Sequence, residues 1–83
     1  MKDWTFAWAD AALADLRNVH WETGARIDAT VQRFAATGEG LRRLVLGDGG
    51  VERCLLVPPY AVVVTIDRRA RIATVWRIVR YAP

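Results

Sequence analysis

The feature that most constrains the fold of this chain is an apolar run at residues 60–66, which reads YAVVVTI. Every side chain in the run is apolar, aromatic or β-branched, a composition typical of a strand that is covered on both faces. Pro58 and Pro59 precede the run and residues 67–70, DRRA, follow it, and both flanks are typical of turns. We therefore expect an inner strand of a sheet, paired on both sides.

Two further strands are expected next to this one, at Val51–Val57 and at residues 72–79. Strands joined by links as short as these must run antiparallel. Residues 41–50 precede them and are interpreted as a connecting segment, because the sequence GDGG at 47–50 is typical of a turn. This glycine cluster is not a nucleotide loop, since it lacks the required lysine and hydroxyl and leads into a strand.

The N-terminal half predicts one short strand and a pair of helices. Alternation places Trp4, Phe6 and Trp8 on one face of a strand. Asp10 is expected to cap a first helix that ends near His20. Gly24 then interrupts the pattern before a second helix begins.

The second helix has an apolar stripe that must pack on the sheet. The stripe is formed by Ile27, Val31, Phe34 and Ala35 at helical spacing, and Gly38 and Gly40 are expected to end the helix. The predicted fold is α+β, a helix hairpin packed on a small antiparallel sheet in the order β-α-α-β-β-β. The expected core includes Leu13, Leu16, Ile27, Val31, Phe34, Val62, Val64 and Trp76.

Length and composition are consistent with a single small domain spanning residues 1–83. Hydrophobic residues make up 53% of the chain, which is too many for intrinsic disorder. Cys54 is the only cysteine, so no disulfide can form within the chain and a cytoplasmic location is expected. No apolar run approaches the ~20 residues that a membrane span needs. We therefore expect that the protein does not associate with a membrane.

The charge is unevenly distributed. Residues 1–40 have a net charge of −2, whereas eight arginines and three acids from residue 41 onward give +5. Eleven of the twelve basic residues are arginine, whose planar fork pairs with phosphate or carboxylate. The pattern favours an anionic partner, either a nucleic acid or an acidic peptide, although a high-GC genome would also enrich arginine.

Counting residues excludes several kinds of catalysis. The chain has no serine, so a Ser-His-Asp triad is excluded, and one histidine with one cysteine cannot form the usual zinc site. We expect no metal and no cofactor. His20 and Cys54 could form a nucleophile pair, but an apolar strand favours a buried structural thiol at Cys54. Asp10, Asp15 and Asp28 are expected at caps or on solvated helical faces.

Arginine and tyrosine are the side chains that remain for chemistry. Together they can hold a phosphodiester and offset the charge of its transition state without a metal. The candidates are Arg53, Arg77 and Arg80 with Tyr60 or Tyr81 beside them. The alternative interpretation is that these arginines are solvated and lie over a sheet edge.

The chain resembles the RelE/ParE superfamily of toxins from bacterial type II toxin–antitoxin systems. The element order matches, and so do two motifs in the first half, which read ALADL at residues 12–16 and RIDA at 26–29. The second half matches at ERCLLV (52–57), PYAVVV (59–64), Asp67 and VWRI (75–78). The resemblance covers nearly the whole chain.

The resemblance implies two mechanisms of growth arrest. RelE-like members cut mRNA in the ribosomal A site, whereas ParE-like members act on DNA gyrase. A catalytically degenerate module that binds RNA or an acidic peptide, without toxicity, is a third alternative. The implied partner is a cognate antitoxin with an acidic segment, in a hetero-oligomer with the toxin.

The resemblance also assigns site residues. It implies catalytic roles for Arg53, Arg80 and Tyr81, with Arg77 and Tyr60 binding the substrate. The arginine that usually follows the family's strand tyrosine is replaced by Ala61, and the lysines of some mRNA-cutting members correspond to Cys54 or Leu55. We therefore expect ribonuclease activity to be weak or absent.

Overall fold

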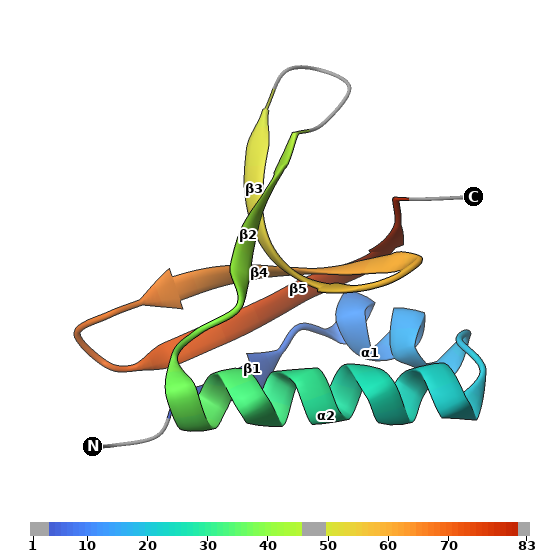
Figure 1. Cartoon of the computed structure of the whole chain (residues 1–83), viewed down its shortest axis with the longest axis horizontal. Coiled ribbons are helices and arrows are strands. Elements are labelled where there is room, and N and C mark those ends of the chain that lie inside the picture. The colour runs from blue at the N-terminus through green and yellow to red at the C-terminus, as the bar shows by residue number, and fades with distance from the viewer. Residues whose placement is uncertain (1–3, 46–49, 82–83) are drawn as a thin grey trace.

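The computed structural model describes residues 4–45 and 50–81. The elements, in chain order, are β1 (Thr5–Trp8), α1 (Asp10–Arg17), α2 (Trp21–Thr37), β2 (Leu41–Val45), β3 (Val51–Val57), β4 (Tyr60–Asp67) and β5 (Ile72–Arg80). Both helices lie on the same side of the sheet, and the β2–β3 hairpin rises away from them (Figure 1). The predicted α+β class, a helix hairpin on a mostly antiparallel sheet, is confirmed.

The sheet has five strands in the order β1-β5-β4-β3-β2, so β4 is an inner strand as predicted. It pairs antiparallel with β3 on one side and with β5 on the other. Its residues Ala61, Val62 and Val64 are buried, which explains why an almost wholly apolar run is tolerated there. β1 is the exception to the antiparallel pattern, because it runs parallel to β5.

The connecting segment predicted at residues 41–50 is partly wrong, since Leu41–Val45 forms β2. This strand pairs antiparallel with β3, and Leu41 lies opposite Leu55 and packs against the core. A five-residue stretch with two consecutive arginines has little strand signal of its own, so the pairing with β3 determines its structure. The predicted glycine turn lies largely at residues 46–49, outside the described part of the chain.

The helix boundaries also differ from the prediction. α1 ends at Arg17, and α2 begins at Trp21 and continues through Gly24. His20 is the N-cap of α2, where its Nδ1 accepts a hydrogen bond from the Glu22 N–H at 3.2 Å. Gly24 therefore does not interrupt the helix, and a side-chain Cβ at this position would make only ordinary contacts with Leu16 and Val19. Asp10 is the first helical residue rather than the cap, and the capping position is Ala9.

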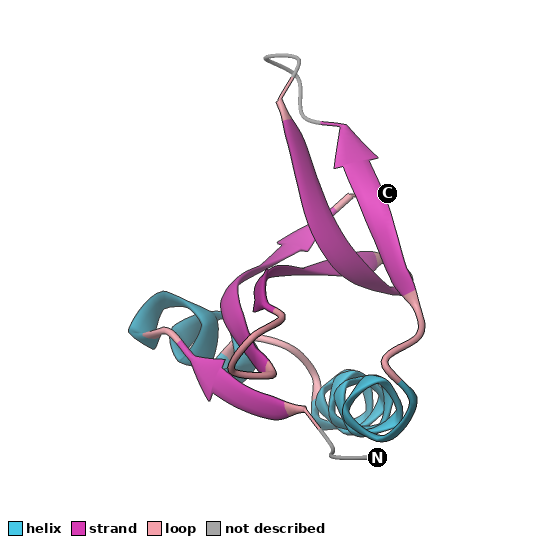
Figure 2. Cartoon of the chain, turned by 90° about the vertical axis from the view of Figure 1, so that its left-hand side faces the viewer, coloured by secondary structure: helices cyan, strands magenta, loops and turns pink. Residues whose placement is uncertain are grey.

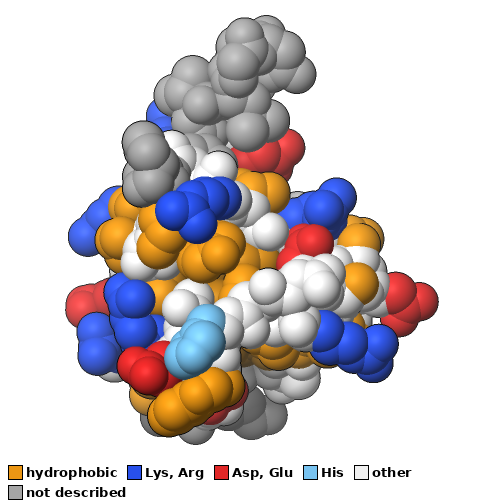
Figure 3. Space-filling model, turned by 90° about the vertical axis from the view of Figure 1, so that its right-hand side faces the viewer, with side chains coloured by type: hydrophobic (Ala, Val, Ile, Leu, Met, Phe, Trp, Pro, Cys, Tyr) orange, Lys and Arg blue, Asp and Glu red, His pale blue; other side chains and the backbone are white. Residues whose placement is uncertain are grey.

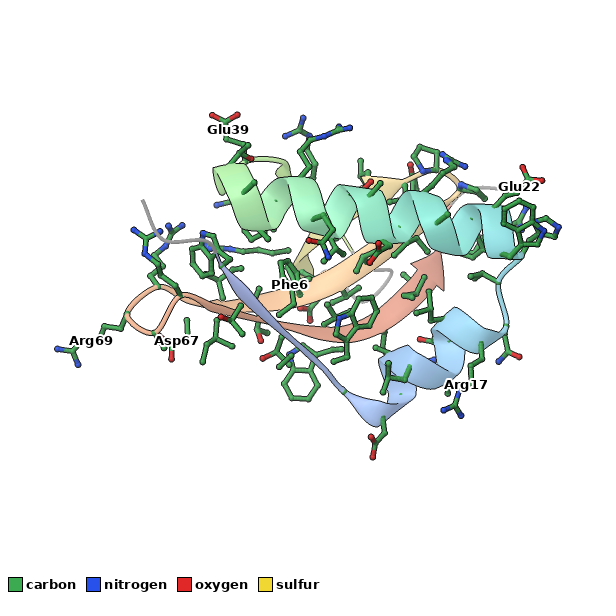
Figure 4. All side chains as sticks on the ribbon, turned by 90° about the horizontal axis from the view of Figure 1, so that it is seen from below. Phe6, Arg17, Glu22, Glu39, Asp67 and Arg69 are labelled. Carbon is green, nitrogen blue, oxygen red and sulfur yellow. The ribbon has the colours of Figure 1, made fainter. Side chains whose placement is uncertain are left out.

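The core lies between α2 and the sheet. Of the predicted stripe, Ile27, Val31 and Phe34 are buried and Ala35 is partly buried. Gly38 ends the helix in the left-handed conformation with φ of 73°. Phe6 from β1 contacts Phe34 edge-on, with 5.7 Å between the ring centroids, and lies between β1 and α2 (Figure 4). The helix is therefore held on the sheet by aromatic as well as aliphatic contacts.

Two residues that were expected in the core are not buried. Leu13 is 38% exposed and Trp76 is 48% exposed, whereas Leu16 is partly buried against the core. Leu13 belongs to α1, a helix of only eight residues that lies beside β5 and buries Ala12, so Leu13 stays partly in contact with solvent. The exposure of Trp76 has a different cause, a β-bulge.

The bulge lies where Val63 pairs with Arg77 but its neighbour Val64 pairs with Val75. Trp76 is therefore the extra residue on β5. A bulge breaks the alternation of side chains between the two faces. Trp76 and Arg77 consequently both lie on the side of the sheet away from the helices, and Ile78 returns to the core.

We call the side of β3, β4 and β5 that faces away from the helices the open face. The β2–β3 hairpin stands at a steep angle to β4 and β5, which makes this side of the sheet concave (Figures 1 and 2). Alternation along the strands, together with the bulge on β5, places these residues on the open face: Glu52, Cys54, Leu56, Ala61, Val63, Thr65, Trp76, Arg77 and Val79.

Candidate functional site

Three of the five predicted site residues lie together at one end of β4 and β5. Tyr60 and Arg80 are directly opposite each other, and the Arg80 guanidinium carbon lies 5.9 Å from the centre of the Tyr60 ring. This is a cation–π geometry. The N–H of Tyr81 donates a 3.0 Å hydrogen bond to the Pro59 carbonyl, which fixes the chain just beyond β5. Tyr81 itself is 39% exposed.

Arg53 lies away from this group. It is paired with Val64, which is four residues along β4 from Tyr60. Because a strand rises by about 3.3 Å per residue, the two positions are about 13 Å apart along the sheet. Arg53 is also two strands from Arg80. The structure thus separates Arg53 from Tyr60, Arg80 and Tyr81.

Arg77 forms an ion pair that the sequence analysis missed. Its Nε donates to Oδ2 of Asp15 at 2.8 Å and its Nη2 donates to Oδ1 at 3.1 Å. Asp15 was expected on a solvated helical face, and that expectation is wrong. The hydrogen bond from the Arg77 guanidinium is the main reason why the pKa of Asp15 lies below its ordinary value, and the same contact raises the pKa of Arg77.

The position of Asp15 follows from the end of β1. β1 pairs with β5 only as far as Val75, so the backbone of β5 beyond this point has no partner strand on that side. The Ile78 N–H donates to Oδ2 of Asp15 at 2.9 Å. α1 thus replaces β1 as the neighbour of β5 and supplies a side-chain acceptor for the sheet edge.

Replacing Asp15 with alanine is expected to destabilise the fold by about 1–2 kcal/mol at pH 7, because Ile78 N–H and Arg77 lose their acceptor. The pKa of Asp15 is lowered in the folded state, so its contribution is complete above the unfolded value of 3.8 and is lost as the pH falls through the folded value. Urea unfolding at pH 7 and near pH 3 measures this.

Asp28→Ala is the matched control, since Asp28 is exposed on α2. It should leave the free energy of unfolding within about 0.5 kcal/mol of the natural chain. A difference between Asp15→Ala and the natural chain that persisted undiminished at pH 3 would contradict the assignment of the ion pair.

The open face contains a groove of about 400 Å³ lined by Glu52, Val63, Thr65, Trp76, Arg77 and Val79. The lining is mostly apolar. The indole of Trp76 is held in place by a 2.7 Å hydrogen bond from its Nε1 to the Thr65 hydroxyl, yet almost half of the side chain is exposed. A large aromatic side chain that is both ordered and exposed is typical of a binding surface.

The open face is poor in cations. Ala61 and Cys54 lie on it, and both are buried with no exposed surface. Burial raises the pKa of the Cys54 thiol, which favours the inert thiol over the thiolate. Within β3, β4 and β5, the only arginine on this face is Arg77, which is paired with Asp15. The face is therefore suited to binding an apolar surface.

The described residues offer no other catalytic centre of a familiar kind. His20 caps α2 at the surface, where it is the pale blue side chain in Figure 3, and Cys54 is buried in β3. Residues 4–45 and 50–81 contain no group of three or more metal-binding side chains. No helix in this part of the chain is long and apolar enough to cross a membrane.

Comparison with solved structures shows what this architecture is similar to. A chain of the toxin–antitoxin complex RelBE2 from Mycobacterium tuberculosis superposes with a TM-score of 0.76 at 14% identity, over 94% of this chain and 98% of that one. A chain of the archaeal RelE–RelB complex from Pyrococcus horikoshii gives 0.73 at 6% identity, over 95% and 96% of the two chains. A chain of the intact Escherichia coli RelBE complex gives 0.65 at 9% identity, over 93% and 95%.

The chain has the RelE fold. No family model matches the sequence, and no curated protein matches it. At 6–14% identity the likeness lies in the architecture and not in shared side chains. The function therefore depends on the side chains that this RelE-like chain presents on its surface, and not on the fold alone.

Proposed function

We propose that this RelE-like chain is the toxin of a type II toxin–antitoxin system, and that it arrests growth by binding its target without cutting RNA. The side chains on the open face are the reason for proposing that RNA is not cut. Cys54 and Ala61 stand where the resemblance places cations of the RNA-cutting members, and both are buried. The remaining arginine, Arg77, is engaged by Asp15.

The proposed partner is an antitoxin that forms a hetero-oligomer with this chain. An apolar anchor of the antitoxin covers the open face, and its acidic segment binds the basic surface of the C-terminal half outside that face. The groove beside Trp76 offers apolar area for an anchor, and the net charge of +5 after residue 40 favours an acidic partner. Chains of similar fold are found in RelBE complexes. The target of the free toxin is proposed to be either the ribosome with its mRNA or DNA gyrase.

Inducing the chain in bacteria tests this function. Growth should stop on induction, and co-expression of the small acidic protein encoded by the adjacent reading frame should restore it. The purified pair should melt at a higher temperature than the toxin alone, because the antitoxin binds only the folded state. Binding should weaken as salt rises.

Normal growth during full induction of soluble, folded protein would contradict the toxin proposal. That result would instead support the degenerate binding module as the function of the chain. Binding without any salt dependence would contradict the proposed role of the acidic segment.

A second candidate function is cleavage of ribosome-bound mRNA. The observation in its favour is the grouping of Tyr60, Arg80 and Tyr81, because an arginine beside two tyrosines can hold a phosphodiester and offset its charge. Arg53 and Arg77 lie elsewhere, so this group would have to act with one arginine. Its activity is proposed to be low for that reason.

A further inference from the structure

We infer that Arg43, Arg53 and Arg68 form a binding site for the phosphate backbone of a nucleic acid. We call these three residues the arginine cluster. The inference rests on the proposed function, since it gives the toxin a contact with its target that is separate from the open face. It also concerns residues, Arg43 and Arg68, that have no role in the site predicted from the sequence.

Strand register brings the arginine cluster together. Arg43 of β2 lies directly opposite Arg53 of β3, and Arg53 lies opposite Val64 of β4. Residues opposite each other point to the same face, and Val64 is in the core, so Arg43 and Arg53 lie on the face away from the groove at Trp76. Arg68 follows β4 in the turn before β5.

The three side chains surround a hollow of about 240 Å³, which Leu41 and Arg42 also line. Arg53 and Arg68 border a second hollow as well, where Glu52 is the one acidic neighbour. No ion pair is formed by Arg43, Arg53 or Arg68 with a carboxylate of residues 4–45 or 50–81. All three are exposed. The hollow therefore presents three guanidinium groups that form no ion pair with a described carboxylate.

The pairing of Arg43 with Arg53 is unfavourable for the fold on its own. Like charges directly opposite on neighbouring antiparallel strands repel each other, since their Cβ atoms are only about 4.5–5.5 Å apart. An anion between the two guanidinium groups would convert this repulsion into two charge-assisted contacts. The geometry thus favours a ligand that carries closely spaced negative charges.

The lining of the hollow favours phosphate over an acidic protein segment. A protein segment gains most of its affinity from apolar anchors in well-packed pockets, and the hollow offers only Leu41, which is partly buried. Phosphate contacts, in contrast, need little more than arginine forks. The apolar groove at Trp76 and the arginine cluster consequently suit two different partners.

The test uses the purified full chain and fluorescence anisotropy with a labelled RNA hairpin and a DNA duplex of the same sequence. In the double variant Arg43→Gln/Arg53→Gln, affinity for at least one of them should fall by about tenfold to a hundredfold. The slope of log K against log salt should become shallower by about two between about 50 and 200 mM salt. RNA preference would indicate a ribosomal target, and DNA preference a gyrase–DNA target.

The control is Arg17→Gln/Arg33→Gln, which removes the same charge from exposed helix positions, and Figure 4 shows Arg17 pointing away from the sheet. It should change the affinity by less than about twofold. The cluster variant should melt at the same temperature as the natural chain or higher, because a repulsive pair has been removed. Loss of nucleic-acid binding with retained or increased stability would support the site.

Equal loss of affinity in the control and cluster variants would overturn the inference, because it would show that only net charge matters. Undetectable binding of the natural chain to both nucleic acids at about 50 mM salt would also overturn it. The inference would also be overturned if the Arg43→Gln/Arg53→Gln variant lost binding to a poly-glutamate peptide but kept its affinity for both nucleic acids. Growth arrest is measured separately, so a failed binding site with intact toxicity is distinguishable from a failure of the proposed function.

Discussion

Trp76→Ala is expected to weaken binding of the antitoxin by about thirtyfold to a thousandfold, which corresponds to about 2–4 kcal/mol for an aromatic anchor at the centre of an interface. The physical reason is that Trp76 is already ordered by its hydrogen bond to Thr65 and is 48% exposed beside the groove. Covering it therefore gains apolar burial at little entropic cost. Isothermal titration calorimetry of the purified pair measures the change.

Trp21→Ala provides a matched control, because Trp21 is another exposed tryptophan, with 74% of its surface accessible, at the start of α2. It lies on the helix layer and should change the antitoxin affinity by less than about twofold. Both variants should remain folded by circular dichroism. Equal effects of the two substitutions, or a larger effect of Trp21→Ala, would place the antitoxin elsewhere than on the open face.

The natural chain is expected to leave ribosome-bound mRNA uncut or to cut it slowly. The rate should be about a hundredfold or more below that of a toxin with cationic side chains at the positions of Cys54 and Ala61. A single charge-assisted contact in a transition state is worth roughly 2–4 kcal/mol, and the open face lacks such contacts at Cys54 and Ala61. Primer extension on ribosome-bound mRNA with purified protein measures cleavage directly.

Efficient cleavage by the natural chain would overturn this expectation. It would favour catalysis by the group of Tyr60, Arg80 and Tyr81. In that event Arg80→Ala should slow cleavage by about a hundredfold or more. Arg53→Ala then tests whether the two arginines act on one phosphate despite their separation across the sheet. Arg17→Ala, on the outer surface of α1, serves as the control (Figure 4).

Ala61→Arg is a poor way to restore a catalytic cation. Ala61 is fully buried, and its cross-strand neighbours on the open face are Leu56 and Val79. A long charged side chain at this position would displace one of them or remain desolvated, at a cost of several kcal/mol. A loss of stability in this variant would therefore say nothing about catalysis.

Several parts of the fold could be predicted from the sequence because their signal is local. The apolar run around Val62 predicts an inner strand, since a nearly continuous apolar run is typical of a strand that is covered on both faces. The stripe of Ile27, Val31 and Phe34 predicts the packed face of α2, because helical spacing alone puts these residues on one side. The charge asymmetry and the absence of serine were likewise properties of the sequence alone.

The candidate site depended on contacts between distant parts of the chain. Arg77 and Asp15 are 62 residues apart, and they meet because β1 stops pairing at Val75 and α1 takes its place beside β5. Trp76 was expected in the core, but the bulge opposite Val63 shifts the alternation and leaves the indole on the open face. No local pattern in the sequence marks either arrangement.

The same distinction applies to the arginines. The sequence shows that the second half of the chain is basic. Its arginines favour an anionic partner, either a nucleic acid or an acidic peptide. Only the pairing of β2 with β3 decides that Arg43 and Arg53 lie opposite each other, and β2 itself exists because β3 offers it backbone partners and a place for Leu41. Local periodicity predicts the buried faces of α2 and β4. Strand register, the bulge and the end points of strands determine which charges meet and on which face Trp76 lies, because those depend on the pairing of segments far apart in the chain.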